Sequence, residues 1–141
     1  MNPAKPYQSV FAPDLLRGQV ILVTGGGSGI GRCTAHELAC LGAHVVLVGR
    51  NQDKLSTTTQ EIVGDGGQAS WHGCDIRRED DVKALVAQVL QQHGRIHGLV
   101  NNAGGQYISP LAHTSAKGWQ AVIDTNLTGG FWWRVSVSTK A

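Results

Sequence analysis

The sequence predicts an α/β fold built on a doubly wound parallel sheet with helices on both faces. Short apolar runs alternate with helical patterns along the chain, at the spacing that right-handed strand–helix–strand crossovers require. The runs at 20–23 and 45–48 are apolar without a break, which is typical of strands buried on both faces of a sheet. A glycine-rich stretch at 25–31 joins the first run directly to a helical pattern.

The strands follow a tail that is expected over residues 1–18. They are predicted at 19–24, 45–48, 68–73 and 96–100. The folded portion is expected over 19–135, and the end of the chain, 136–141, is atypical of it.

Helical patterns lie between these strands. A helix is predicted over 29–41, with Ile30, Leu38 and Leu41 facing the core and Gly42 ending it. A second helix is predicted over 53–63, although its serine and threonines are weak helix formers.

The later helices have clearer periodicity. Apolar residues at i, i+3, i+4, i+7 and i+8 over 82–90 mark one helix, which begins after an acid-rich turn and ends at Gly94. A last helix is marked by Trp119, Val122, Ile123 and Leu127. The pair Gly129-Gly130 is expected to interrupt it.

Composition excludes several classes of protein. The net charge of +2 comes from scattered basic residues, so no stripe favours nucleic acid. No apolar stretch approaches the roughly 18 residues of a membrane span, and no N-terminal signal is present. Three cysteines without framework spacing fit a reducing compartment, so a cytoplasmic location is expected. The histidines are dispersed, and no metal site is expected.

The glycine-rich stretch at 25–31 is the first candidate for a ligand-binding site. Thr24-Gly25-Gly26-Gly27-Ser28-Gly29-Ile30-Gly31 places three spaced glycines between a strand and the start of a helix. Such a turn lets a ligand approach the backbone closely, and the free N–H groups of the helix favour a phosphate. The alternative is a tight strand-to-helix connection without a ligand.

That turn resembles the cofactor turn of the short-chain dehydrogenase/reductase family. Three later segments match the same family in order: Cys74-Asp75-Ile76, Asn101-Asn102-Ala103-Gly104 and Thr125-Asn126-Leu127-Thr128-Gly129. The resemblance implies a Rossmann-type doubly wound parallel sheet, truncated after about four strands, with 19–135 as the N-terminal portion of a dinucleotide-binding domain. It implies that Gly25, Gly27, Ser28, Gly29, Ile30 and Gly31 bind a nicotinamide dinucleotide.

The end of the second strand indicates which dinucleotide is bound. An acid there would hold the ribose 2′-hydroxyl of NAD, whereas an arginine accommodates the 2′-phosphate of NADP. Gly49 occupies the acidic position and Arg50 follows it, with Ser28 and Asn51 as additional neutral donors. The cofactor is therefore predicted to be NADP(H); the alternative for Arg50 is a solvated surface charge.

The resemblance also implies roles for residues after the next strands. Asp75 and Ile76 would lie against the adenine ring, with Asp75 accepting from its amino group; the alternative for Asp75 is a helix cap. The segment Asn102-Ala103-Gly104 would line the cofactor, and Asn126 would be the asparagine of the catalytic tetrad. The alternative for Asn126 is a residue that only kinks its helix.

The family's remaining catalytic groups, a serine and a Tyr-x-x-x-Lys pair, are absent from these 141 residues. The resemblance implies an NADP(H)-dependent oxidoreductase that transfers hydride to an enoyl or carbonyl substrate, and within the family the peroxisomal type of trans-2-enoyl-CoA reductase is most similar. A peroxisomal address also stays open, because a C-terminal signal would lie in the part of the domain that these residues lack. The family forms homo-oligomers, but its main dimer helix is also missing, so this chain is expected to be inactive alone. The alternative function is a non-catalytic nucleotide-binding fragment.

Overall fold

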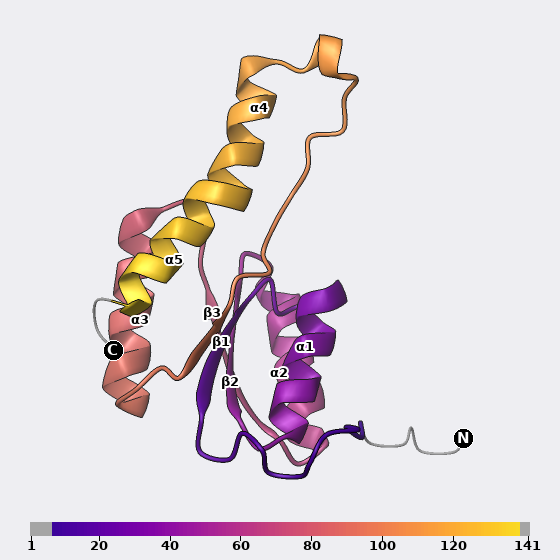
Figure 1. Cartoon of the computed structure of the whole chain (residues 1–141), viewed down its shortest axis with the longest axis vertical. Coiled ribbons are helices and arrows are strands. Elements are labelled where there is room, and N and C mark those ends of the chain that lie inside the picture. The colour runs from indigo at the N-terminus through magenta and orange to yellow at the C-terminus, as the bar shows by residue number, and fades with distance from the viewer. Residues whose placement is uncertain (1–6, 139–141) are drawn as a thin grey trace.

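The computed structural model describes residues 7–138 as one parallel four-stranded sheet with helices on both faces (Figure 1). The strands are β1 (Val20–Thr24), β2 (His44–Gly49), β3 (Gln68–Gly73) and β4 (Gly98–Val100), in the order β3-β2-β1-β4. Every strand pair is parallel. The predicted fold class is therefore confirmed.

Two hydrophobic layers sandwich the sheet. On one face, helices α1 (Gly29–Cys40) and α2 (Gln52–Gly64) pack against alternate residues of β1 and β2, such as Val23 and Leu47. On the other face, α3 (Glu79–His93) and α5 (Gly129–Ser138) cover Leu22 and Val46. All five residues of β1 are buried, as the unbroken apolar run predicts. Since each face of a strand meets its own helical layer, polar alternation is absent from these strands.

Strand β4 is shorter than predicted. Ile96, expected in the strand, precedes it and is buried in the core on the α3 side. The His97 N–H donates to the Val20 carbonyl over 2.8 Å, and regular pairing with β1 begins only at Gly98. The carboxyl end of β4 is nevertheless beside that of β1, which positions the segment after it.

The inward face of α1 differs from the prediction. Ile30 is 79% exposed, whereas Gly31, Ala35 and Ala39 form the buried stripe at i, i+4 and i+8. Small residues on that stripe let the helix lie close to the sheet, and Ile30 is rotated away by one position. Leu41 is buried, as predicted. The helix α3 agrees with its prediction and ends at Gly94, which has φ +74°.

The expected break at Gly129-Gly130 does not occur. Helix α4 (Ala116–Ile123), a π-helical turn η2 (Asp124–Thr128) and α5 follow one another without interruption. Figure 1 shows them as one long rod, whose α5 end lies beside α3. A Cβ on Gly129 would lie 3.0 Å from the Ile76 carbonyl oxygen. The glycine therefore serves close packing rather than a break.

Within residues 7–138, no helix is long and apolar enough to cross a membrane. The short 3₁₀ turn η1 (Leu111–His113) belongs to the long connection between β4 and α4. The predicted atypical end, 136–141, extends past the described residues, although Ser136 is still part of α5 and is buried.

Candidate nucleotide-binding site

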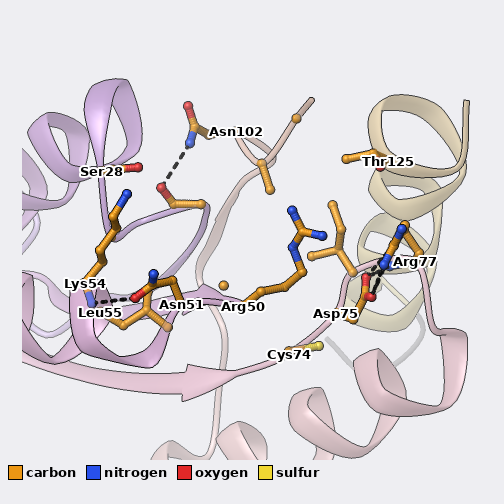
Figure 2. A pocket seen from close by; sticks show the side chains of 16 residues that line it. Ser28, Arg50, Asn51, Lys54, Leu55, Cys74, Asp75, Arg77, Asn102 and Thr125 are labelled. Atoms are coloured by element: carbon orange, nitrogen blue, oxygen red, sulfur yellow. Dashed lines mark hydrogen bonds and ion pairs between the residues drawn. The ribbon is translucent and has the colours of Figure 1, made fainter. Parts of the chain in front are cut away.

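A cavity of about 570 Å³ opens at the carboxyl ends of the strands (Figure 2). Most of the predicted cofactor-binding residues line it: Gly25, Gly27, Ser28, Arg50, Asn51, Asp75, Ile76, Asn102, Ala103 and Gly104. Gly29, Ile30 and Gly31 do not line it; they form the first turn of α1 beside it. Asn126 does not line it either. This edge is where ligands bind in open parallel sheets, because the connections diverge there.

Thr24 joins the ends of β1 and β4 beneath the cavity. Its hydroxyl oxygen accepts from the backbone N–H groups of Asn102 and Ala103, each over 3.0 Å, and donates to the Val100 carbonyl over 3.3 Å. The Asn102 side-chain amide donates to the Thr24 carbonyl over 2.9 Å. The glycine turn and the segment after β4 are therefore held as one unit.

Glycine is required at two positions of the turn for different structural reasons. Gly25 has φ +70°, a conformation that favours glycine, and its N–H donates to the Val48 carbonyl over 2.7 Å. A Cβ on Gly31 would lie 2.3 Å from the Gly25 carbonyl oxygen and 2.4 Å from Asn102 Nδ2. Helix α1 thus begins in contact with the turn, and only glycine permits that contact. Ser28 precedes the helix, and its hydroxyl makes no capping bond.

Positive side chains line the cavity beside β2. Figure 2 shows the Arg50 side chain extending between Asn51 and Asp75. Within residues 7–138 Arg50 has no hydrogen-bond or ion-pair partner. The Asn51 side-chain oxygen caps α2 by accepting from the Lys54 N–H over 3.0 Å, so this cap places Lys54 at the cavity. Gly49, as expected, brings no carboxylate to this end of β2.

Asp75 forms an ion pair with Arg77 at the far side of the cavity. Arg77 Nε lies 2.9 Å from one carboxylate oxygen and 3.2 Å from the other, and Nη2 contacts the second oxygen as well. These bonds hold the pKa of Asp75 at about 2, with a smaller contribution from the Arg50 charge. Asp75 does not cap α3, whose N-cap is Arg78.

Cys74 reaches the cavity from the end of β3 but is not a reactive thiol. Its side chain is buried, and burial, followed by the charges of Asp81 and Asp75, raises its pKa to about 11. A thiol that stays protonated at neutral pH is a poor nucleophile and a poor metal ligand. Within the described part of the chain, no group of three or more His, Cys, Asp or Glu side chains could hold a metal ion.

Asn126 lies in η2 and binds the loop after β4. Its side-chain amide donates to the Gly105 carbonyl over 2.7 Å and to the Val122 carbonyl over 2.9 Å, and its oxygen accepts from the Gly105 N–H over 3.2 Å. A Cβ on Gly104 would lie 2.7 Å from that oxygen. Asn126 lies at the centre of this π-helical turn, a distortion that is frequent at functional sites.

Sequence reasoning did not assign six residues to the cavity: Gly49, Lys54, Leu55, Cys74, Arg77 and Thr125. Two of these carry charge. Lys54 had a usable signal, since it lies three positions after Asn51, a residue type that favours helix N-caps. Arg77 had a weaker one, since it stands two positions after an aspartate in a strand-to-helix connection.

The cavity fits a dinucleotide in its chemistry. A glycine turn that a Cβ would fill borders a helix N-terminus, and Arg50 and Lys54 supply uncompensated positive charge beside it. At the other side, Asp75 supplies an acceptor that remains ionised. These groups match a phosphate-rich ligand with a purine ring.

Comparisons with known proteins agree with this geometry. The family model for short chain dehydrogenases matches residues 19–140. A curated relative, the 2,5-dichloro-2,5-cyclohexadiene-1,4-diol dehydrogenase of Sphingobium indicum, is 43% identical over 82% of this chain and 46% of its own. The peroxisomal 2,4-dienoyl-CoA reductase of Mus musculus is 36% identical over 89% of this chain and 43% of its own. The chain therefore spans less than half the length of these curated relatives.

Solved structures are similar over the same region. One described as a citronellol catabolism dehydrogenase (AtuB) of Pseudomonas aeruginosa PAO1 is 61% identical, with a TM-score of 0.92, over 96% of this chain and 55% of that one. A metagenomic short-chain oxidoreductase in complex with NADP is 40% identical, with a TM-score of 0.84, over 89% of this chain and 57% of that one. With a matching family model, sheet topology and glycine turn, the chain belongs to the short-chain dehydrogenase/reductase family.

Proposed function

We propose that this chain is the cofactor-binding portion of an NADP(H)-dependent oxidoreductase, with residues 19–135 forming the first part of its dinucleotide-binding domain. The observation that carries the proposal is Arg50, which enters the cavity directly after Gly49 without a protein partner in the described residues. An acid at position 49 would repel a 2′-phosphate, whereas an unpaired guanidinium binds one. The NADP complex of a 40% identical relative supports the same assignment.

Each group at the cavity has a proposed task in holding NADP(H). The glycine turn and the start of α1 receive the diphosphate, with the Ser28 hydroxyl as a donor. Arg50 and Lys54 bind the 2′-phosphate, and Asn51 keeps Lys54 in place through its cap. Asp75 and Ile76 contact the adenine ring, and Asn102, Ala103 and Gly104 line the path toward the nicotinamide.

When bound, the nicotinamide cofactor supplies or accepts a hydride at the substrate carbon. Asn126 holds the loop at Gly105 and is the proposed tetrad residue of this chain. No Tyr-x-x-x-Lys pair follows it within the 141 residues, so we propose that this chain binds cofactor but has no turnover alone. A non-catalytic nucleotide-binding role is the second candidate.

The substrate is proposed to be an enoyl thioester or a carbonyl compound. The similarity to a 2,4-dienoyl-CoA reductase favours the thioester. The 61% identity to a citronellol catabolism dehydrogenase favours an alcohol or carbonyl compound. Both involve hydride transfer at one carbon, so they share the cofactor geometry proposed for this chain.

Calorimetric titration of the 141-residue protein with NADPH and NADH tests the cofactor assignment. NADPH is expected to bind about 10- to 100-fold more tightly, since one charge-assisted contact contributes roughly 1.5–3 kcal/mol. Tighter binding of NADH would overturn the assignment. A parallel assay of NADPH oxidation with an enoyl-CoA and a ketone is expected to stay at background; measurable turnover would overturn the proposed inactivity.

A further inference from the structure

Arg77 lies beside the proposed adenine site without belonging to the phosphate-binding group. Its guanidinium binds both oxygens of Asp75, which is 24% exposed, and the pair closes the far side of the cavity from Ser28 (Figure 2). Arg50 and Lys54 have no such partner within residues 7–138. Arg77 therefore differs from them, because its charge is already compensated by a carboxylate that faces the ligand space.

The backbone around Asp75 restricts that carboxylate further. The backbone N–H of Arg77 donates over 3.1 Å to the Asp75 oxygen that lies nearer to Arg77 Nε. The Arg78 N–H donates to the Asp75 carbonyl over 3.0 Å. Between these residues Ile76 is buried, and Gly129 of α5 packs on its carbonyl. One oxygen of Asp75 is thus fixed by the backbone and the other by the guanidinium alone.

The guanidinium carries a charge that two neighbouring carboxylates stabilise. Bonding to Asp75, and more weakly the charge of Asp124 in η2, raises the pKa of Arg77. A planar guanidinium can hold two carboxylate oxygens at once, whereas an ammonium group binds as a single point. Removing the Arg77 guanidinium would leave the Asp75 carboxylate free to rotate about its terminal torsion.

We propose that Arg77 is a positioning residue that aims the Asp75 carboxylate at the exocyclic amino group of the cofactor's adenine, and so makes the site select a 6-aminopurine over a 6-oxopurine. The inference rests on the proposed NADP(H) function. A carboxylate only accepts hydrogen bonds. Three N–H groups of Arg77 bind the Asp75 oxygens: the backbone N–H, the Nε–H, which both oxygens share, and one on Nη2. One of the roughly four lone-pair positions of the carboxylate is therefore left for a further donor. An amino group donates to it, whereas a 6-oxo group presents another oxygen and repels it.

The test measures dissociation constants for NADPH and for its 6-oxo (hypoxanthine) analogue by calorimetry on the 141-residue protein. The unmodified chain is expected to prefer NADPH by about 10- to 100-fold, since the bond to a charged acceptor contributes roughly 1.5–3 kcal/mol. In Arg77→Gln the preference is expected to fall to about 2-fold, and in Arg77→Lys to an intermediate value. The ratio of the two constants is internal to each variant, so a general loss of stability leaves it unchanged.

Arg78→Gln is the matched control. Arg78 is the next residue, but it pairs with Asp81 over 3.1 Å on the surface of α3 and does not line the cavity. Its preference for NADPH is expected to equal that of the unmodified chain. Asp75→Ala is expected to lose the preference as fully as Arg77→Gln, and the double variant to lose no more, because both residues act through one contact.

The outcomes separate this inference from the function on which it rests. Failure of NADPH to bind the unmodified chain would overturn the proposed function and the inference together. NADPH binding without discrimination against the 6-oxo analogue would overturn the inference alone. So would an Arg77→Gln variant that weakens both ligands equally, because Arg77 would then act only as a positive charge.

Discussion

Asn102 donates two hydrogen bonds to Thr24, 78 positions earlier in the chain: its N–H to the threonine hydroxyl over 3.0 Å and its side-chain amide to the threonine carbonyl over 2.9 Å. Both residues end strands, and the two strands pair in parallel. The contact therefore closes the carboxyl edge of β4, which is only three residues long. It places the segment 102–104 against the glycine turn.

Thr24→Val tests how much this contact contributes. Valine keeps the β-branched shape but removes the hydroxyl that accepts from the N–H groups of Asn102 and Ala103 at a buried position. The Asn102 N–H keeps the Val100 carbonyl as an acceptor over 3.0 Å, whereas the Ala103 N–H loses its acceptor. An unsatisfied buried donor costs about 1–3 kcal/mol, so the free energy of unfolding is expected to fall by that amount in urea denaturation. Thr57→Val, which removes one exposed bond to the Asp53 carbonyl, is the control and is expected to change it by less than about 0.5 kcal/mol.

Gly31→Ala tests the close approach of α1 to the turn. The added methyl group would lie 2.3 Å from the Gly25 carbonyl oxygen, a backbone atom that cannot move without distorting the turn. The expected loss of unfolding free energy is about 1–3 kcal/mol, with loss of NADPH binding. Gly64→Ala is the control, because nothing lies within 4 Å of its Cβ position at the end of α2. It is expected to be neutral or stabilising by up to about 1 kcal/mol, and equal effects of the two changes would contradict the packing argument.

Arg50→Gln tests the proposed contact with the 2′-phosphate. Glutamine keeps a polar side chain but removes the charge, so affinity for NADPH is expected to fall about 10- to 100-fold while affinity for NADH changes little. Calorimetry with both cofactors measures the two effects. Arg95→Gln is the matched control, since Arg95 is exposed just before Ile96, near the opposite edge of the sheet. An equal loss of affinity for both cofactors would show that Arg50 does not bind the 2′-phosphate.

The sequence predicts the position of the cavity well, for a physical reason. The chain alternates strands and helices, so Gly25, Arg50, Asp75 and Asn102 all follow predicted strands, and parallel pairing brings those ends to one edge. These four residues come together because of the order of strands and helices alone, and the periodicity of apolar residues in the sequence predicts that order. The bounds of β2 and β3 depend on the same signal and agree with the prediction to within one residue at each end.

The features that prediction missed depend on packing between distant elements. The apolar pattern predicts Ile30 inward with Leu38 and Leu41, but Ile30 is exposed, and a stripe of small residues that includes Ala35 and Ala39 is buried instead. Gly129 was expected to break a helix, but its neighbour is the Ile76 carbonyl. Neither the packing of α1 on the sheet nor the contact of Gly129 with Ile76 can be predicted from the neighbouring residues in the sequence.

A pair of histidines predicts how stability depends on pH. His44 and the α3 residue His93 have ring centroids 4.4 Å apart, and burial followed by the His93 charge lowers the pKa of both His44 and His72. The unfolded chain, with an ordinary pKa near 6.5, then binds more protons than the folded one. Stability is therefore expected to be constant between about pH 7 and pH 8 and to fall as the pH drops below about 6.5.

Urea midpoints measured from pH 5 to pH 8 check this prediction. The depressed carboxyl pKa values of Asp75 and Glu61 act at lower pH, so they do not produce the same decline. His44→Gln is expected to reduce the slope between pH 5 and pH 7, because it removes one of the two facing rings. His113→Gln, at an exposed position, is expected to leave the slope unchanged. A flat profile for the unmodified chain would contradict the prediction.

Asn126→Ala tests whether the π-helical turn controls the loop after β4. The side chain makes two hydrogen bonds to the backbone of Gly105 and one to Val122, so alanine is expected to release the loop and to lower unfolding free energy by about 1–2 kcal/mol. Hydrogen exchange at the Gly105 amide is expected to accelerate, because its acceptor is removed. Gln120→Ala is the control: its bond to Asp124 lies within the same rod but does not touch the loop. If both variants left exchange at Gly105 unchanged, Asn126 would only fill its helix position, and its place in η2 would have no effect on the cavity.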